Sequence, residues 1–137
     1  MRKILFFILG LLLVGCVEKT TNPNLEIDGV IINSFLVLES QKSRFTNGGM
    51  MEVEARFKNT SSFNRGLLYK VDWFDENGFL ITNITTKWKR ATVQSNRDFI
   101  VRAISPSDKA VDYKIRITTP DSDDKDIKTI NRYEFKN

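Results

Sequence analysis

The stretch M-E-V-E-A-R-F-K, at Met51–Lys58, alternates apolar and charged side chains over eight residues. Because successive side chains of a β-strand point to opposite faces, this period of two predicts a half-buried strand with one face in water. The same alternation recurs in Asp112–Thr118, where Tyr113, Ile115 and Ile117 form the apolar side. Two strands of this kind indicate a sheet that buries one face and exposes the other.

Turn signals separate these strands from their neighbours. Thr46–Gly49 (T-N-G-G) and Asp75–Gly78 (D-E-N-G) are typical of tight turns, because Asn and Gly tolerate the positive φ that such turns need. Pro106 ends another strand, since proline cannot donate to a ladder. Further strands are predicted at Glu26–Glu39 (one long strand, or two with a bend at Asn33-Ser34), Leu67–Phe74, Phe79–Ile84, Lys87–Gln94 and Asp98–Ile104.

The spacing of these segments predicts the fold class. Beyond the N-terminal apolar run, no stretch shows a helical period of 3.6 for more than one or two turns. Short strands at roughly 8–15-residue intervals are typical of sandwiches and barrels. We therefore expect an all-β protein, an immunoglobulin-like antiparallel β-sandwich of about seven strands, with a closed barrel as the alternative.

The N-terminus has the features of an export signal. Met1–Lys3 is basic, and the apolar run Ile4–Val14 is shorter than the about 20 residues that a membrane-spanning helix needs, so a signal peptide fits it better. Leu13–Cys16 (L-V-G-C) resembles the bacterial lipobox, which implies cleavage before Cys16 and acylation of its thiol. The alternatives are a general secretory signal and a buried N-terminal helix. Val17, in place of Asp, favours outer-membrane attachment in a host that uses that sorting rule.

These segments give an expected organisation for the chain. An acyl chain contributes about 0.8 kcal/mol per buried methylene, so two or three chains on Cys16 anchor a protein stably to a membrane. Export excludes nucleic acid as a natural partner, although the formal net charge is +4. The expected parts are a signal peptide (1–15), the acylated cysteine with a polar tether (16–24), a β-sandwich domain (25–118), and an acidic linker with a C-terminal extension (119–137).

Composition excludes several kinds of catalytic site. The chain has no histidine and a single cysteine, so it has no imidazole base, no internal disulfide and no Cys-rich zinc site. Asp121-x-Asp123-x-Lys125 begins like a calcium loop, but a lysine stands where an oxygen ligand belongs. Asp72 and Asp75 are explained by solvation of an outward side chain and by turn chemistry. We expect a protein that is not an enzyme and holds no metal or cofactor.

One cluster has the character of a binding surface. Lys87-Trp88-Lys89-Arg90, with Arg97 and Arg102 nearby in the sequence, combines cations with an aromatic ring and could meet anionic headgroups, wall polymer or an acidic protein face. Alternatively, Trp88 points inward and the lysines protect a sheet edge. Phe74 and Phe79 flank the hairpin as candidate contact residues or as loop packing, and Trp73 is expected in the core.

Four features occur in a fixed order between Gly48 and Ile117: Asn59-Thr60-Ser61, Tyr69-x-x-x-Trp73-Phe74-Asp75-x-x-Gly78, Trp88, and Ser105-Pro106 with Ala110 ahead of Tyr113–Ile117. By these features the segment resembles the YcfL-type family of periplasmic lipoproteins, whose function is unassigned. The resemblance implies a β-sandwich lipoprotein without a known activity, and the lipobox cysteine fits it. In enterobacteria, family members lie beside the gene of a lipoprotein activator of a peptidoglycan synthase, which implies a link to cell-wall work. The family commonly has Ala where this chain has Ser105, and the acidic C-terminal extension lies outside the pattern.

Two functions remain open from the sequence. The first is a non-enzymatic, lipid-anchored periplasmic module that binds an unidentified envelope protein as an accessory. The second is a structural lipoprotein that binds peptidoglycan or anionic lipid directly. Retention on purified peptidoglycan or anionic vesicles that falls as salt rises would distinguish the second function from the first.

Overall fold

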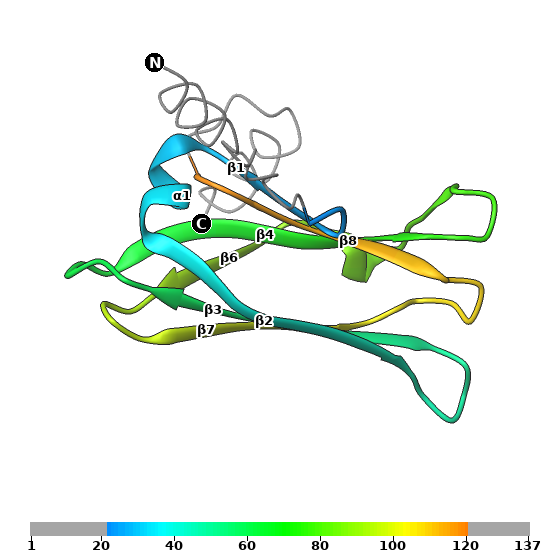
Figure 1. The fold of residues 1–137 in the computed structure, drawn as a ribbon. Coiled ribbons are helices and arrows are strands. Elements are labelled where there is room, and N and C mark those ends of the chain that lie inside the picture. The colour runs from blue at the N-terminus through cyan, green and yellow to red at the C-terminus, as the bar shows by residue number, and fades with distance from the viewer. Residues whose placement is uncertain (1–21, 121–137) are drawn as a thin grey trace, which may run out of the picture.

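The computed structural model describes residues 22–120, which form two β-sheets packed face to face (Figure 1). In the larger sheet the strand order is β1-β8-β4-β5, with β6 also paired to β4, and in the smaller sheet it is β2-β3-β7. The predicted all-β sandwich is confirmed, with eight strands among the described residues. The elements are β1 (Leu25–Asp28), α1 (Val30–Phe35), β2 (Leu36–Phe45), β3 (Met51–Asn59), β4 (Arg65–Phe74), β5 (Leu80–Ile81), the 3₁₀ turn η1 (Ile84–Thr86), β6 (Lys89–Val93), β7 (Asp98–Ile104) and β8 (Asp112–Thr118).

The core lies between the inner faces of the two sheets. β3 buries every second residue, as its alternation predicts, and Phe57 at its far end is fully buried. From the larger sheet, Trp73 is 2% exposed and its ring centroid lies 6.3 Å from that of Tyr113. Tyr69 meets Phe99 of the smaller sheet edge to face, with centroids 5.4 Å apart. Aromatic side chains of both sheets therefore hold the layers together.

The prediction of one or two strands across Glu26–Glu39 is wrong in its middle. Gly29, with φ of 124°, ends β1 in a conformation that side-chain-bearing residues avoid, and the six-residue helix α1 follows. Ile32 and Phe35, three positions apart, point into the core. The side chain of Asn33, which was expected in a bend, donates to the carbonyl oxygen of Gly29 at 3.0 Å. One and a half turns are too short for a helical period to be visible in the sequence.

The first pairing is also not antiparallel as expected. β1 lies parallel to β8, with Leu25 opposite Ile115 and Asp28 opposite Thr118. The remaining pairs in both sheets are antiparallel. After β1, the chain passes through α1 to the smaller sheet, where β2 begins (Figure 1).

The strands predicted at Phe79–Ile84 and Lys87–Gln94 are shorter in the structure. Only Leu80–Ile81 pairs with β4, and β6 begins at Lys89, one residue after the tryptophan expected to open it. Between them, the side-chain oxygen of Asn83 accepts a hydrogen bond from the backbone N–H of Thr85. The backbone N–H of Asn83 donates to the Thr86 hydroxyl. This capping box starts η1. The Thr-rich sequence has strand propensity, but the local side-chain hydrogen bonds override it.

The two predicted turns are confirmed, and their side chains explain their geometry. Gly49 and Gly78 have φ of 79° and 81°. The Asp75 carboxylate accepts the backbone N–H groups of Asn77 and Phe79, both at 2.9 Å. The Asp75 side chain therefore stabilises the turn, as predicted, because backbone N–H donors occupy its acceptor oxygen.

A buried asparagine ties the loop after β3 to the turn between the sheets. Asn59 is fully buried, and its amide group donates to the carbonyl oxygens of Phe63, Val93 and Gln94 at 2.9–3.1 Å. Its side-chain oxygen accepts both the N–H and the hydroxyl of Ser61. The sequence marks Asn59 only as the first residue of a polar loop, whereas the structure makes it the centre of a satisfied polar network.

Several expectations lie outside the described residues. These are the signal peptide, Cys16, most of the tether, the calcium-like loop and the C-terminal extension. The last tether residues are described and contact the sandwich. Asn24 donates to the Asp112 carboxylate at 2.8 Å and to the Tyr113 carbonyl at 2.6 Å, and Asn22 donates to Gln41 at 2.7 Å.

The packing of Trp73 leads to a stability prediction. Replacing Trp73 by Ala should lower the free energy of unfolding by about 3–5 kcal/mol, because it leaves a large cavity between the sheets. Phe79→Ala is the matched control, since that ring is 70% exposed and its loss should change stability by less than about 0.5 kcal/mol. Urea unfolding followed by tryptophan fluorescence and circular dichroism measures both, and equal losses would contradict the core assignment.

Candidate functional site

A groove opens between β4 of the larger sheet and β7 of the smaller one. β4 is paired along one side by β6 at Arg65–Tyr69 and by β5 at Trp73–Phe74. Between these two partners, Lys70–Asp72 faces no strand on that side. The 3₁₀ turn η1 crosses here instead of a strand, and the sandwich stays open over a groove of about 410 Å³.

Cationic side chains gather at this groove. Lys87 and Lys89, on either side of Trp88, both line it and are exposed. The exposed Arg102 and the half-buried Lys70 line it as well. Tyr69 and Trp73 form part of its apolar wall. The structure thus brings together Lys87, Lys89 and Arg102, which the sequence grouped, with Lys70, which it did not.

The remaining members of the predicted surface lie elsewhere. Trp88 is half-buried, with the Lys70 ammonium 4.9 Å from its ring centroid, and it does not line the groove. Arg90 is exposed and also lies outside the groove lining. Phe74 is half-buried at the end of β4, while Phe79 is exposed in the hairpin. In this cluster the odd-numbered Lys87 and Lys89 line the groove and the even-numbered Trp88 and Arg90 do not. Successive side chains of an extended backbone point to opposite sides, which explains this division.

The four groove cations differ in how they are compensated. Arg102 is bonded to the Glu54 carboxylate, and the Lys70 ammonium lies 3.4 Å from the Asp72 carboxylate. Among residues 22–120, no ion pair involves Lys87 or Lys89. The groove therefore has an excess of positive charge at these two lysines, which an anionic ligand can neutralise.

The expectation that Asp72 is solvated is wrong. Asp72 is 6% exposed, and its carboxylate lies 2.7 Å from the guanidinium Nε of Arg116 as well as near Lys70. Arg116 also reaches Glu26 of β1 at 2.9 Å, and Lys114 lies 3.8 Å from the same carboxylate. Because β8 supplies Arg116 and β4 itself supplies Lys70, Asp72 is held as one end of an ion network across the larger sheet rather than as one of a reactive carboxylate pair.

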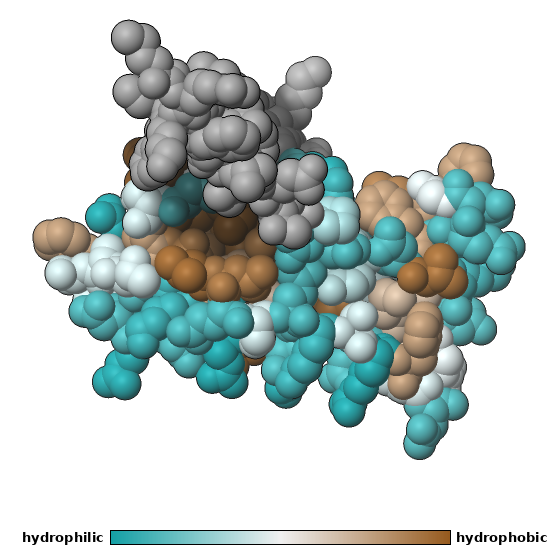
Figure 2. All heavy atoms as spheres, in the orientation of Figure 1, coloured by the Kyte–Doolittle hydropathy of each residue, from teal (hydrophilic) through white to brown (hydrophobic). Residues whose placement is uncertain are grey.

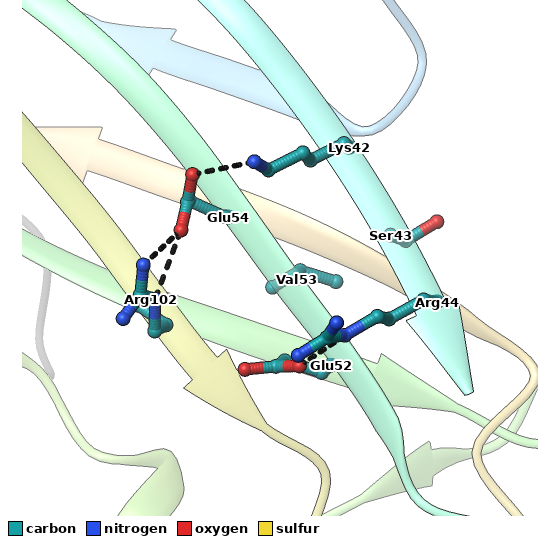
Figure 3. A pocket seen from close by; sticks show the side chains of 7 residues that line it. All are labelled: Lys42, Ser43, Arg44, Glu52, Val53, Glu54 and Arg102. Atoms are coloured by element: carbon teal, nitrogen blue, oxygen red, sulfur yellow. Dashed lines mark hydrogen bonds and ion pairs between the residues drawn. The ribbon is translucent and has the colours of Figure 1, made fainter. Parts of the chain in front are cut away.

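A second hollow, of about 350 Å³, lies on the outer face of the smaller sheet (Figure 3). Its charges are matched across strands, since Lys42 meets Glu54 at 2.9 Å and Arg44 meets Glu52 at 2.6 Å. Arg102 of β7 reaches Glu54 from the opposite side. In Figure 2, which has the orientation of Figure 1, hydrophilic residues cover the lower surface, where the smaller sheet lies. Hydrophobic residues are visible between the two sheets.

The ion pairs of this hollow shift the titration of its residues. Hydrogen bonding by Arg102 and then Lys42 lowers the pKa of Glu54 from 4.5 to about 2, and Glu54 in turn raises the pKa of Arg102. Of these residues, only Arg102 was expected from the sequence, as a cation near the Lys87–Arg90 cluster and not as a partner of Glu54. A two-strand hairpin around Thr46–Gly49 would have predicted them, because that register places Lys42 opposite Glu54. Paired in this way, these groups stabilise the sheet and leave the acids little capacity for catalysis.

Between residues 22 and 120, no cluster of three or more Asp, Glu, Cys or His side chains is arranged to hold a metal ion. Within the same range, no helix is long and apolar enough to span a membrane.

Residues 24–119 match a family described as a protein of unknown function, DUF1425. The chain belongs to this family. The DUF1425 chain is also similar in fold to two crystal structures. One is cj0090 of Campylobacter jejuni, at TM-score 0.60 and 20% identity, covering 72% of this chain and 99% of that one. The other is a DUF1425 family member from Shewanella sp. pv-4, at TM-score 0.54 and 21% identity, covering 60% and 75%. No curated protein sequence matches the chain significantly.

The lowered pKa of Glu54 leads to a prediction for the pH dependence of stability. Because the folded value, about 2, lies below the ordinary 4.5, the stabilisation is present above pH 4.5 and is lost as the pH falls towards 2. Glu54→Gln should therefore reduce the loss of stability across this window. Urea unfolding of the wild type and the variant at several pH values, at low and high salt, measures this pH-dependent loss of stability. An unchanged pH slope in the variant would contradict the assignment.

Proposed function

We propose that this DUF1425 protein is a YcfL-type lipoprotein, a non-enzymatic, lipid-anchored module that binds an acidic partner in the periplasm of a bacterial cell. The observation that carries the proposal is the groove between β4 and β7, where Lys87 and Lys89 have no ion-pair partner among the described residues. Its chemistry is that of a binding surface, because ammonium groups and apolar walls recognise a ligand without reacting with it.

The electrostatics of the groove favour an acidic partner over a neutral one. Two unit charges 4 Å apart interact by about 1 kcal/mol in water and several times more near a protein surface. An acidic group that enters the groove gains this interaction with Lys87 and Lys89 without first breaking an ion pair there. Binding should consequently weaken as salt rises.

The lipid anchor gives the groove its place in the envelope. A lipid on Cys16, eight residues before Asn24, would hold the sandwich close to the membrane surface. The lipobox and the resemblance to YcfL-type lipoproteins support this anchor, and Val17 supports the outer membrane. The gene neighbourhood of that family supports a partner in cell-wall synthesis.

The anchor is tested by Cys16→Ser. The variant should lose its acyl groups and move from the membrane fraction to the soluble envelope fraction, because the acylated thiol is gone. Membrane fractionation and the intact mass of the protein measure this. The matched variant Val17→Asp should stay acylated and, in an enterobacterial host, shift to the inner membrane. Membrane retention of Cys16→Ser would contradict the proposal.

The groove is tested by the double variant Lys87→Ser/Lys89→Ser. In-cell crosslinking of the acylated, tagged protein, with mass spectrometry of the captured proteins, should identify one dominant envelope protein that this variant loses. Arg97→Ser/Lys109→Ser removes the same charge from exposed positions elsewhere and should keep it. Both variants should unfold cooperatively, as the wild type does.

Other results of the same experiment would overturn the partner proposal. Recovery of only abundant outer-membrane proteins, or equal loss in both double variants, would contradict it. Salt-sensitive retention on purified peptidoglycan or anionic vesicles, lost in Lys87→Ser/Lys89→Ser, would instead support direct binding of glycan or lipid.

A further inference from the structure

Among residues 22–120, strand β7 has an unpaired backbone edge next to the groove. Within that range it pairs with β3 alone and is the last strand of the smaller sheet. The Ser105 N–H donates to Met51 at 2.7 Å, and Arg97 accepts from Asn59 at 3.0 Å, so odd-numbered residues bond to β3. The register between these two pairs is continuous. In an antiparallel ladder, the intervening even-numbered residues then point their N–H and C=O groups away from β3, towards the free edge.

This edge lacks the protection that other edges of the sandwich have. Asp98–Ile104 contains no proline or glycine and no bulge, and Ile100 and Ile104 are 43% and 54% exposed. At the opposite end of the same sheet, β2 has a register shift after Leu38 and the charged side chains Lys42 and Arg44. β1 and β5 are only four and two residues long. Natural proteins use such devices to prevent strand addition. β7 has only the charged side chains Asp98 and Arg102, and each is paired with a charge on β3, Arg56 and Glu54 respectively.

The groove determines which strand could be added. Arg102, Ala103 and Ile104 of β7 line it, with Lys87 and Lys89 on the side of the larger sheet. Side chains of an added strand would alternate, every second one pointing between the two sheets into this groove. Acidic groups at those positions would meet the two lysines.

We propose that the free edge of β7 takes up an extended, acidic segment of a partner protein as an additional strand, with alternate acidic side chains in the groove beside Lys87 and Lys89. Backbone hydrogen bonds to the even-numbered residues of β7 supply affinity, and the groove lysines supply selectivity for acidic sequences. This inference rests on the proposed binding function and adds the mode of contact.

Charge also argues against a second copy of the chain as the occupant. A second β7 edge offers Lys87 and Lys89 no unpaired acid, because its acidic residue, Asp98, already lies 3.0 Å from Arg56. It would therefore leave both lysines without a counter-charge, whereas an acidic segment neutralises them.

The first test is a titration of the acylated protein, in uncharged detergent micelles, with an acetylated and amidated peptide of alternating Thr and Glu. Nuclear magnetic resonance should show the amides of Ile100, Arg102 and Ile104 shifting and exchanging more slowly with solvent. The amides of Val101 and Ala103, already bonded to β3, should move less. A peptide of alternating Thr and Lys should have no such effect. Unchanged β7 amides at millimolar acidic peptide would overturn the inference.

A proline at position 100 separates backbone pairing from charge. Because the Ile100 N–H points away from β3, Ile100→Pro removes a free-edge donor and leaves the ladder to β3 intact, as edge-strand prolines do. Ile100→Thr is the matched control, which loses the same apolar side chain but keeps the N–H. Peptide binding should be lost in Ile100→Pro and kept in Ile100→Thr.

The lysine variant distinguishes failure of this inference from failure of the proposed function. Lys87→Ser/Lys89→Ser should bind the peptide roughly tenfold more weakly, the scale of two lost exposed ion pairs. If that variant weakens binding while Ile100→Pro binds like the wild type, the groove binds acids and strand addition is wrong. If neither variant changes binding, both proposals fail. If Ile100→Pro does not fold, the amide pattern of the wild type decides.

Discussion

The structure depends on how the two edges of β4 are shared. One edge is occupied by β8 along Leu68–Phe74, while the other is divided between β6 and β5. The chain between β5 and β6, residues 82–88, is longer than the stretch of β4 opposite it, Lys70–Asp72, so it leaves the ladder there and forms η1. The groove, its lysines and its apolar wall all follow from this division, because a continuous strand there would have closed the sandwich.

The strands that the sequence predicts well are those in which apolar residues alternate with polar ones and the apolar residues are buried. In β3 and β8, every second position is apolar and the structure buries it, so the period of two is sufficient. The failures occur where one residue changes the backbone over a few positions. Gly29 and Asn83 each redirect the chain by a positive φ or by side-chain hydrogen bonds, and neither effect alters the hydrophobic pattern.

The candidate site was predictable in part for a related reason. The sequence identifies Lys87 and Lys89 as a cationic cluster because they are close in the chain, and alternation explains why they share a side. It groups Arg102 with them only by nearness in the chain and does not indicate Lys70, since the positions of these two cations beside the groove depend on how the two sheets are stacked. The prediction for Asp72 failed because solvation was inferred from strand alternation alone, whereas β8 supplies Arg116 to the same face.

The parallel pairing of β1 with β8 determines how the sandwich responds to a mechanical pull. The chain joins the fold near Tyr113, where Asn24 is bonded, and β1 then runs alongside β8 in the same direction. A force applied at Asn22 along the strand axis would therefore load the paired positions Leu25–Asp28 together, in shear, instead of opening them one at a time. A pull along this axis is consequently resisted better than a pull that peels β1 away from β8.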